Sequence, residues 1–324
     1  MGIYSRKSKL PPACCPGVYK QAAYSYDCGG QAAAVDIIRE HSNYQESEMP
    51  TPELRVRYFQ DSTPEDVPCL ESNFIRREFD MPLAQEQTAL VLVDLWNIHF
   101  IESWLARAKQ VMEEKVLPMI EAARHAGMLI VHAPSPPVAA QFPEHRTEVP
   151  PKPIMPASGP DWPPPEFRRR QGDYGAYLGP RSQPPGIGFR WNPMKDQLSI
   201  SPSVEVGEDE PVISDAHELH HVLARNKILH LVYAGFATNW CLVGRDYGIR
   251  NMSRYGYNIV VLREATTGVE FPDTVENCFV TEVTIREIEQ QYGFSTSNQD
   301  FENYCMSRPR MKRATDEEDE EGHG

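Results

Sequence analysis

The stretch TALVLVDLW, residues 88–96, decides the fold. It is a nearly continuous apolar run of strand length, interrupted only by Asp94. A strand that is apolar on both faces has to be covered on both faces, as happens in a parallel sheet between two layers of helices. An aspartate at the carboxyl end of such a strand lies where open α/β sheets bind their ligands.

The segments that follow alternate between helical and strand patterns. Apolar side chains recur at helical spacing over residues 102–127, and Gly127 ends that pattern. Further strand patterns lie at 128–134, 210–214, 228–236, 257–264 and 294–297, and further helical patterns lie at 216–227, 239–256 and 273–293. This alternation predicts one α/β domain over residues 86–300, with three layers and a mostly parallel sheet covered by helices on both faces.

Three segments do not follow this alternation. Residues 1–85 lack a sustained apolar period, apart from a short helical pattern at 31–41, so we expect an N-terminal extension that packs on the core or is partly disordered. Residues 134–207 form a Pro-rich insertion with many aromatic side chains, which indicates a lid or an oligomer contact. We expect residues 301–324 to be an acidic, disordered tail.

Composition excludes several classes of function. The chain has 324 residues and a formal net charge of -14, which disfavours binding to nucleic acid. Its apolar runs are too short to span a membrane, and its first residues lack the apolar core of a signal peptide. Seven cysteines are scattered without the spacing of a zinc site, which indicates free thiols in a reducing, cytoplasmic compartment.

Cys241 is the candidate nucleophile. It follows the predicted strand at 228–236 and opens the predicted helix at 239–256. The start of a helix lowers the pKa of a thiol, and its free N–H groups can hold a developing oxyanion. Asp94, at the equivalent end of another strand, could accept the thiol proton and return it to a leaving group. Simple packing of the cysteine and helix capping by the aspartate remain the alternatives.

These residues lie in motifs that resemble a known family. The strand TALVLVDLWN and the block GFATNWCLVGRDYGIRNMSRYGYNIVVLREATTG resemble the isochorismatase-like cysteine hydrolases, which include nicotinamidases and N-carbamoylsarcosine amidohydrolases. The resemblance covers residues 88–296. It implies a six-stranded parallel sheet, a homo-oligomer, and hydrolysis of a C–N bond in a small amide or ureido substrate through a Cys241 thioester, with Asp94 as acid and base. It also implies a cis peptide at Phe236–Ala237 and an oxyanion hole formed by the N–H groups of Ala237 and Cys241.

One departure from the family pattern concerns its lysine. Ser214 and Asp215 occupy the neighbourhood where the family carries a lysine that assists the cysteine. Possible substitutes are His217, Lys195 and the cluster at 168–170. At helical spacing from the cysteine, Arg245 and Asp246 are interpreted as a structural salt bridge. Without the lysine, a catalytically lapsed protein that binds a small ligand or a partner chain remains the alternative.

A second departure concerns metal. His132 and His145 do not have the spacing of the metal ligands in nicotinamidase-like members, so we expect no zinc and no other cofactor. This disfavours nicotinamide as the substrate. Side chains next to the two candidate catalytic residues are predicted to bind the substrate: Trp96, Asn97 and Asn239, with Trp240 either lining the pocket or capping the helix.

Overall fold

The computed structural model describes residues 51–151 and 162–307. The predicted helix at 31–41 and the acidic run at 316–321 lie outside these residues.

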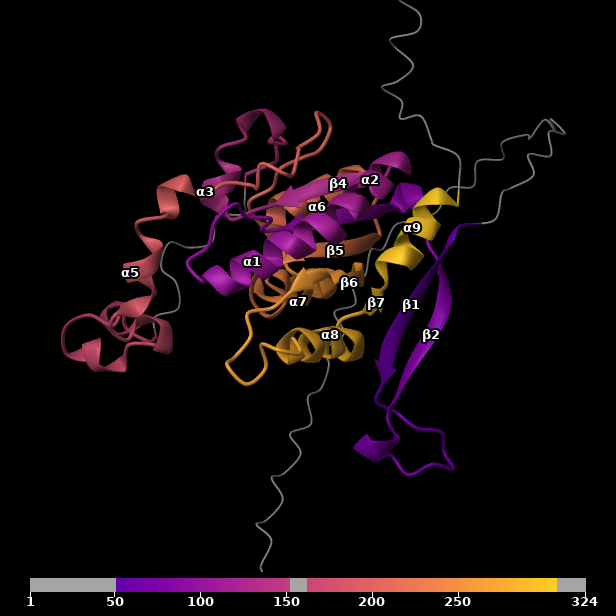
Figure 1. Cartoon of the computed structure of the whole chain (residues 1–324), viewed down its shortest axis with the longest axis horizontal. Coiled ribbons are helices and arrows are strands. Elements are labelled where there is room, and N and C mark those ends of the chain that lie inside the picture. Colours follow the sequence, from indigo (N-terminus) through magenta and orange to yellow (C-terminus); the bar gives the residue numbers. More distant parts are fainter. Residues whose placement is uncertain (1–50, 152–161, 308–324) are drawn as a thin grey trace, which may run out of the picture. The chain divides into compact units, whose positions relative to one another are not determined.

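The described residues form an α/β fold around one sheet of seven strands (Figure 1). The strand order is β2-β1-β7-β6-β5-β3-β4. From β7 to β4 all neighbours are parallel, whereas β1 is antiparallel to both β7 and β2. The strands are β1 Glu53–Gln60, β2 Ile75–Pro82, β3 Thr88–Val93, β4 Leu129–Ala133, β5 His230–Phe236, β6 Asn258–Thr267 and β7 Phe294–Thr296.

The prediction of six strands is corrected at both edges of the sheet. The strand expected at 210–214 is reduced to a single parallel bridge between Val212 and His132 on the β4 edge. Pro211 has no N–H to extend this pairing, and the chain enters a helix at Asp215. At the other edge, β1 and β2 add two strands that the sequence did not predict.

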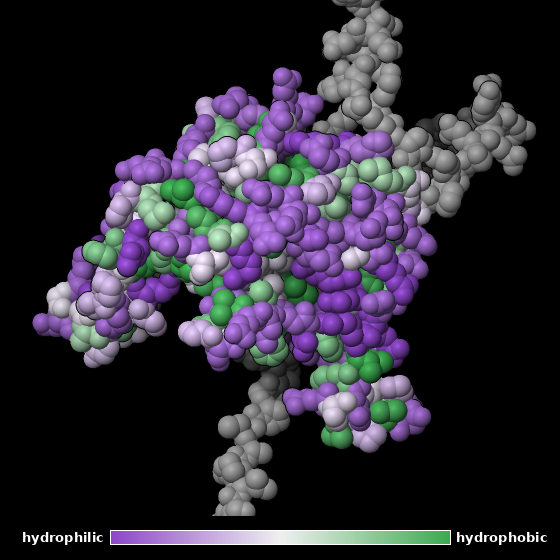
Figure 2. Space-filling model, viewed as in Figure 1, coloured by the Kyte–Doolittle hydropathy of each residue, from purple (hydrophilic) through white to green (hydrophobic). Residues whose placement is uncertain are grey.

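The hairpin of β1 and β2 comes from the segment assigned to an N-terminal extension. Leu54 and Val56 are buried, but β2 is mostly exposed and rich in charge, which explains why no strand pattern was visible. The fully buried carboxylate of Glu289 accepts hydrogen bonds from Arg57 (2.7 Å) and Arg76 (3.0 Å), which fixes the hairpin to the core. Figure 2 shows apolar side chains at the tip of the hairpin, which include Val67, Leu70 and Ile75.

Helices cover the sheet in two layers (Figure 1). The first layer contains α1 Glu102–Val111, α2 Leu117–His125 and α9 Asn298–Met306, and the second contains α6 Ala216–Arg225, α7 Ile249–Arg254 and α8 Phe279–Gln291. Side chains of β3 point alternately to the two helix layers. Leu90 and Leu92 pack against the first layer. Val91 and Val93 pack against the second. A π-helical turn, Met112–Val116, joins α1 to α2 where one helix was expected.

Three short α-helices lie in the described part of the insertion, and the core ends later in the chain than predicted. The insertion contains α3 Pro136–Ala139, α4 Pro165–Arg168 and α5 Gly186–Trp191. The acidic tail was expected from residue 301, but α9 continues to Met306 and buries Phe301 and Tyr304 in the core. Within residues 51–151 and 162–307, no helix is long and apolar enough to cross a membrane.

The order of the strands places a crevice beside β3. The chain passes from β3 to β4 on one side and returns to β5 on the other, so the strand order reverses between β3 and β5. Ligands of open α/β sheets bind at the carboxyl ends of such strands. Gly235 lets β5 approach β3 closely here, because its φ is 113° and an added Cβ would lie 2.1 Å from the Val93 carbonyl oxygen.

Candidate active site

Asp94 follows β3 directly and is held in an unusual backbone conformation. Its φ of 46° is in the left-handed region, and its side chain is 1 % exposed. The left-handed conformation costs a non-glycine residue of the order of 1 kcal/mol, and such residues cluster at functional sites. The backbone thereby holds a carboxylate in the protein interior at the carboxyl end of the strand.

Cys241 lies in the loop that follows β5. The helix expected at 239–256 is broken into a π-helical turn, Thr238–Leu242, and the short helix α7. The cysteine is therefore in a single turn and not at the start of a long helix, so little helix dipole is available to ionise its thiol. The thiol contacts Asp94, which brings the two predicted catalytic side chains together.

Arg245 is the cation of this site. Its guanidinium donates two hydrogen bonds to Asp94 Oδ2, from Nε (3.1 Å) and from Nη2 (2.9 Å). Arg245 lies four positions after Cys241, so one turn of the chain places both side chains toward the aspartate. The predicted salt bridge between Arg245 and Asp246 is wrong, because Asp246 accepts a hydrogen bond from the Ala216 N–H instead.

Burial determines the protonation of this group. It raises the pKa of the Asp94 carboxyl, and the charge of Arg245 opposes that rise. Burial also raises the pKa of the Cys241 thiol to about 12, and the charge of Asp94 adds to this while Arg245 opposes it. The prediction of a lowered thiol pKa is therefore wrong, and at neutral pH the resting proton is on the sulfur.

One of the two expected oxyanion donors, the N–H of Ala237, lies next to the sulfur. The peptide between Phe236 and Ala237 is cis, as the family resemblance implies. The backbone N–H of Ala237 hydrogen-bonds the Cys241 sulfur.

The predicted substitutes for the family lysine lie elsewhere. His217 is in the first turn of α6, and its Nε2 is 2.9 Å from the Pro150 carbonyl oxygen. Lys195 and the 168–170 cluster belong to the insertion, and Arg170 stacks on Phe167. None of these residues lines the pocket at Cys241. The helical spacing of Arg245 from Cys241 was the signal that could have identified the cation from the sequence.

An aromatic pocket of about 490 Å³ opens at Cys241. The core and the insertion both contribute to its walls. It is lined by Trp96, His99, Phe100, Arg181, Ile187, Trp191, Trp240, Cys241, Gly244 and Arg245. Of the predicted substrate-binding residues, Trp96 and Trp240 lie in this wall.

Two predicted substrate-binding residues hold loops instead. Asn97 donates to the Gln197 carbonyl (2.9 Å) and accepts from the Ser199 N–H (2.9 Å), which attaches the insertion to the core. Asn239 makes an equivalent pair of bonds with the backbone of Val269. Both side chains position the surroundings of the pocket without lining it.

His99 is a pocket residue that the sequence analysis missed. Its ring lies 4.5 Å from the ring of Phe100 and 5.6 Å from that of Trp191, centroid to centroid. Burial lowers the pKa of His99 to about 4, and the nearby charge of Arg181 adds to the effect. The histidine is therefore a neutral aromatic wall at neutral pH.

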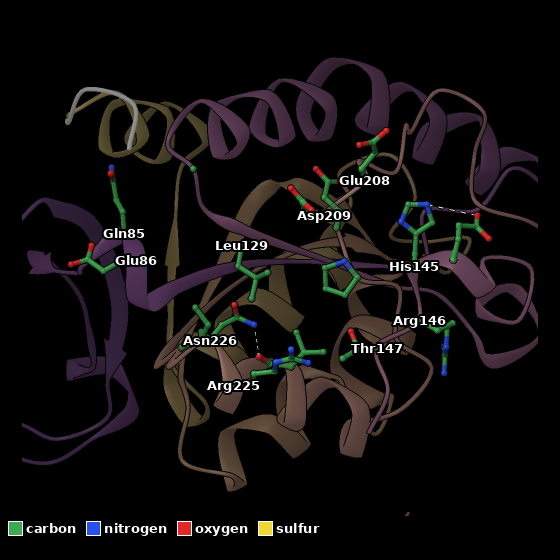
Figure 3. A pocket seen from close by; sticks show the side chains of 16 residues that line it. Gln85, Glu86, Leu129, His145, Arg146, Thr147, Glu208, Asp209, Arg225 and Asn226 are labelled. Carbon is green, nitrogen blue, oxygen red and sulfur yellow. Dashed lines mark hydrogen bonds and ion pairs between the residues drawn. The ribbon is translucent and has the colours of Figure 1, made fainter. Parts of the chain in front are cut away.

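A larger hollow of about 670 Å³ lies at the other end of the strands (Figure 3). It adjoins Leu129, at the start of β4, and Ile228, just before β5. Figure 3 shows charged side chains around it, which include Glu208, Asp209 and Arg225, and no cysteine is among its described lining residues. Its position at the amino ends of the strands makes it the weaker candidate for catalysis despite its size.

The two histidines considered for metal binding are separately engaged. Nε2 of His132 lies 2.7 Å from Glu210 Oε2, and His145 lies beside Glu144. In the part of the chain that the structure describes, no three His, Cys, Asp or Glu side chains converge on one point.

Among known proteins, only solved structures were found to be similar to this chain. No family model and no curated protein matches the sequence. A cysteine hydrolase from Pseudomonas syringae pv. phaseolicola 1448A is 18% identical, with a TM-score of 0.43 over 70% of this chain and 95% of that one. An isochorismatase family protein from Burkholderia thailandensis is 17% identical, with a TM-score of 0.38 over 68% of this chain and 96% of that one.

Several of the solved structures that resemble the chain are isochorismatase family proteins or isochorismatase-like hydrolases. The similar structures also include a nicotinamidase from Staphylococcus aureus, which is 14% identical, with a TM-score of 0.35 over 64% of this chain and 96% of that one. This is the family that residues 88–296 resemble in sequence. Identities this low do not transfer an activity or a substrate.

Proposed function

We propose that the protein is a cysteine-dependent hydrolase that cleaves the C–N bond of a small amide or ureido compound through a thioester. The observation that carries this proposal is the placement of Cys241 beside the Asp94–Arg245 pair, at the carboxyl ends of β3 and β5. Packing alone would not require a buried ion pair next to a thiol, because burying charge is costly.

Acylation begins from the neutral thiol. As the Cys241 sulfur attacks the substrate carbonyl carbon, its proton passes to Asp94, and the N–H of Ala237 supports the developing oxyanion. The C–N bond then breaks, the amine leaves with the proton from Asp94, and a thioester remains on Cys241.

Deacylation repeats these transfers with water. The water gives a proton to Asp94 and its oxygen attacks the thioester carbon, after which the C–S bond breaks. The acid product leaves, and the sulfur takes the proton back from Asp94. The sum of both halves is hydrolysis of one C–N bond by one water.

Arg245 suits this chemistry for two reasons. A guanidinium remains charged throughout the cycle, so it can stabilise the thiolate while Asp94 carries the proton. Both of its hydrogen bonds end on Asp94 Oδ2. Oδ1 receives neither of these bonds, so this oxygen is the acceptor for the thiol proton in the proposed mechanism.

The hypothesis of a lapsed, ligand-binding protein rested on the missing lysine. Arg245 provides a cation next to Asp94, which favours the hydrolase.

The test is a panel of small amides and ureido acids incubated with the full chain. We expect amine or ammonia release from some members, and intact-mass measurement of quenched samples should find an acyl group on the peptide that contains Cys241. Absence of both release and adduct across the panel, with a folded protein, would reject the hydrolase in favour of the binding protein.

A further inference from the structure

The aromatic pocket presents flat surfaces to its ligand. Trp96 and Trp191 lie with their ring centroids 5.7 Å apart, and Phe100 lies 5.8 Å from Trp191. Trp240, which precedes the nucleophile, forms another wall. Aromatic walls with few polar groups favour a planar, apolar ligand body.

The charges of this pocket do not cancel. Arg245 is neutralised by its ion pair with Asp94, and His99 is uncharged at neutral pH. Arg181 therefore remains as a positive charge, since none of the described lining residues is acidic. A positive pocket is notable in a chain whose formal net charge is -14.

Arg181 is placed to bind a ligand. Its guanidinium lies 4.5 Å from the centroid of the Trp240 ring. Stacking on an indole fixes the plane of a guanidinium but leaves its N–H edges available. No residue of the ranges 51–151 and 162–307 forms an ion pair or a side-chain hydrogen bond with Arg181. As far as the described residues show, the insertion thus brings an unpaired bidentate donor to the wall beside Cys241.

We propose that Arg181 selects substrates that carry a carboxylate, so that the preferred substrate is a planar amide with a negative group at its far end. The carboxylate binds the guanidinium, the aromatic walls hold the ring, and the amide carbonyl meets Cys241. This rests on the proposed hydrolase for turnover, but the binding of the anion does not depend on it. Bidentate pairing with arginine is the arrangement that recognises carboxylates in many proteins.

The first experiment compares two kinds of amide. Turnover of benzamide is measured against the three positional isomers of carbamoylbenzoate, which differ from benzamide by one carboxylate. We expect kcat/KM to be roughly 10- to 100-fold higher for the best isomer, mainly through KM, since a hydrogen-bonded charge pair contributes that much to binding.

Variants then assign the preference to one side chain. Arg181→Ala should abolish it, Arg181→Lys should retain part of it, and Arg181→Glu should reverse it. Arg190→Ala is the matched control, because Arg190 belongs to the same insertion but does not line the pocket. Its preference should equal that of the unchanged protein.

A second experiment measures binding without turnover. Benzoate and benzamide are titrated while tryptophan fluorescence is followed, since three tryptophans line the pocket: Trp96, Trp191 and Trp240. Benzoate should bind more tightly than benzamide, and Arg181→Ala should remove the difference.

The outcomes separate the two proposals. Hydrolysis of benzamide and carbamoylbenzoates with equal efficiency, unchanged in Arg181→Ala, overturns the role of Arg181 but leaves the hydrolase. Benzoate binding that depends on Arg181, with no amide hydrolysed, overturns the hydrolase but supports the anion site. Equal binding of benzoate and benzamide to the unchanged protein overturns the anion site.

Discussion

The two hollows at opposite ends of the strands differ in what surrounds them. The larger hollow has charged walls, but Arg146 pairs with Glu218, and Glu210 pairs with both Arg124 and His132. The smaller pocket has aromatic walls, a thiol and a positive charge that the described lining residues leave unpaired. The difference between the two hollows is therefore the nucleophile, because an unpaired charge beside a thiol can bind a ligand and hold it for reaction, whereas the described lining of the larger hollow has no cysteine.

Volume alone would select the end of the sheet opposite to the proposed active site. The position of the strands gives a better criterion, because strand order reverses beside β3 and ligands bind at the carboxyl ends there. Substitutions at the two ends should therefore affect different properties, namely turnover at one end and stability at the other.

The largest expected effect is at the nucleophile. Cys241→Ala should lower kcat by about 10⁴-fold or more for any amide that the protein hydrolyses, because no group remains to form the thioester. Arg225→Ala, in the larger hollow, is the matched control and should change kcat by less than about twofold. Steady-state rates of both variants check this, and a substantial loss in Arg225→Ala alone would reverse our assignment of the two hollows.

The second largest effect is expected for Asp94→Asn. This variant should reduce kcat/KM by about 10³-fold, which is the scale of a lost general base. The carboxylate must be ionised to accept the thiol proton, so activity should fall as pH decreases through its pKa. Burial raises that pKa, which places the acid limb of the kcat/KM profile above the ordinary aspartate value of about 3.9. A limb at or below that value would contradict the role of Asp94.

Arg245→Met should lower kcat/KM by roughly 10²-fold, the scale of one preorganised electrostatic partner. It should also move the acid limb to higher pH, because the charge of Arg245 opposes the rise in the Asp94 pKa. Arg245→Lys keeps the charge but loses the paired hydrogen bonds. Its kcat/KM should therefore lie between that of the unchanged protein and that of Arg245→Met. If Arg245→Met left both the rate and the limb unchanged, Arg245 would be a structural residue only.

The smallest effect on turnover is expected for Glu210→Gln, which should instead lower the free energy of unfolding by roughly 2 kcal/mol. Burial acts to raise the Glu210 pKa, but hydrogen bonds from His132 and Arg124 hold it at about 2. A lowered carboxyl pKa stabilises the fold above its unfolded value of about 4.3, and this contribution is lost as pH falls from there toward 2. Urea unfolding across that pH range should show a smaller pH dependence in the variant.

The main sheet could be predicted from sequence because its strands carry nearly uninterrupted apolar runs. Residues 88–93 and 231–236 are buried on both faces, as expected for inner strands of a parallel sheet. The hairpin of β1 and β2 could not be predicted this way. Its outer strand is exposed and charged, and its attachment depends on Glu289, which lies more than 200 residues further along the chain.

The site was predictable only in part, for a related reason. Asp94 and Cys241 follow strands, so their convergence follows from the order of a parallel sheet. The pocket residues Arg181 and Trp191 belong to an insertion whose path no periodic pattern specifies. The sequence did contain the helical spacing of Arg245 from Cys241, but the carboxylate that Arg245 binds follows β3 and is not the neighbouring Asp246.

The proximity of Arg245 to Cys241 along the chain has a consequence for how the site can change. Residues 236–245 contain the backbone donor, the thiol and the cation, and only the carboxylate arrives from another strand. Most of the groups in the proposed mechanism thus lie in one continuous segment of the chain. If the proposed hydrolase is correct, changes in the length or side chains of the insertion would alter which substrates the pocket accepts and leave the groups that break the bond in place.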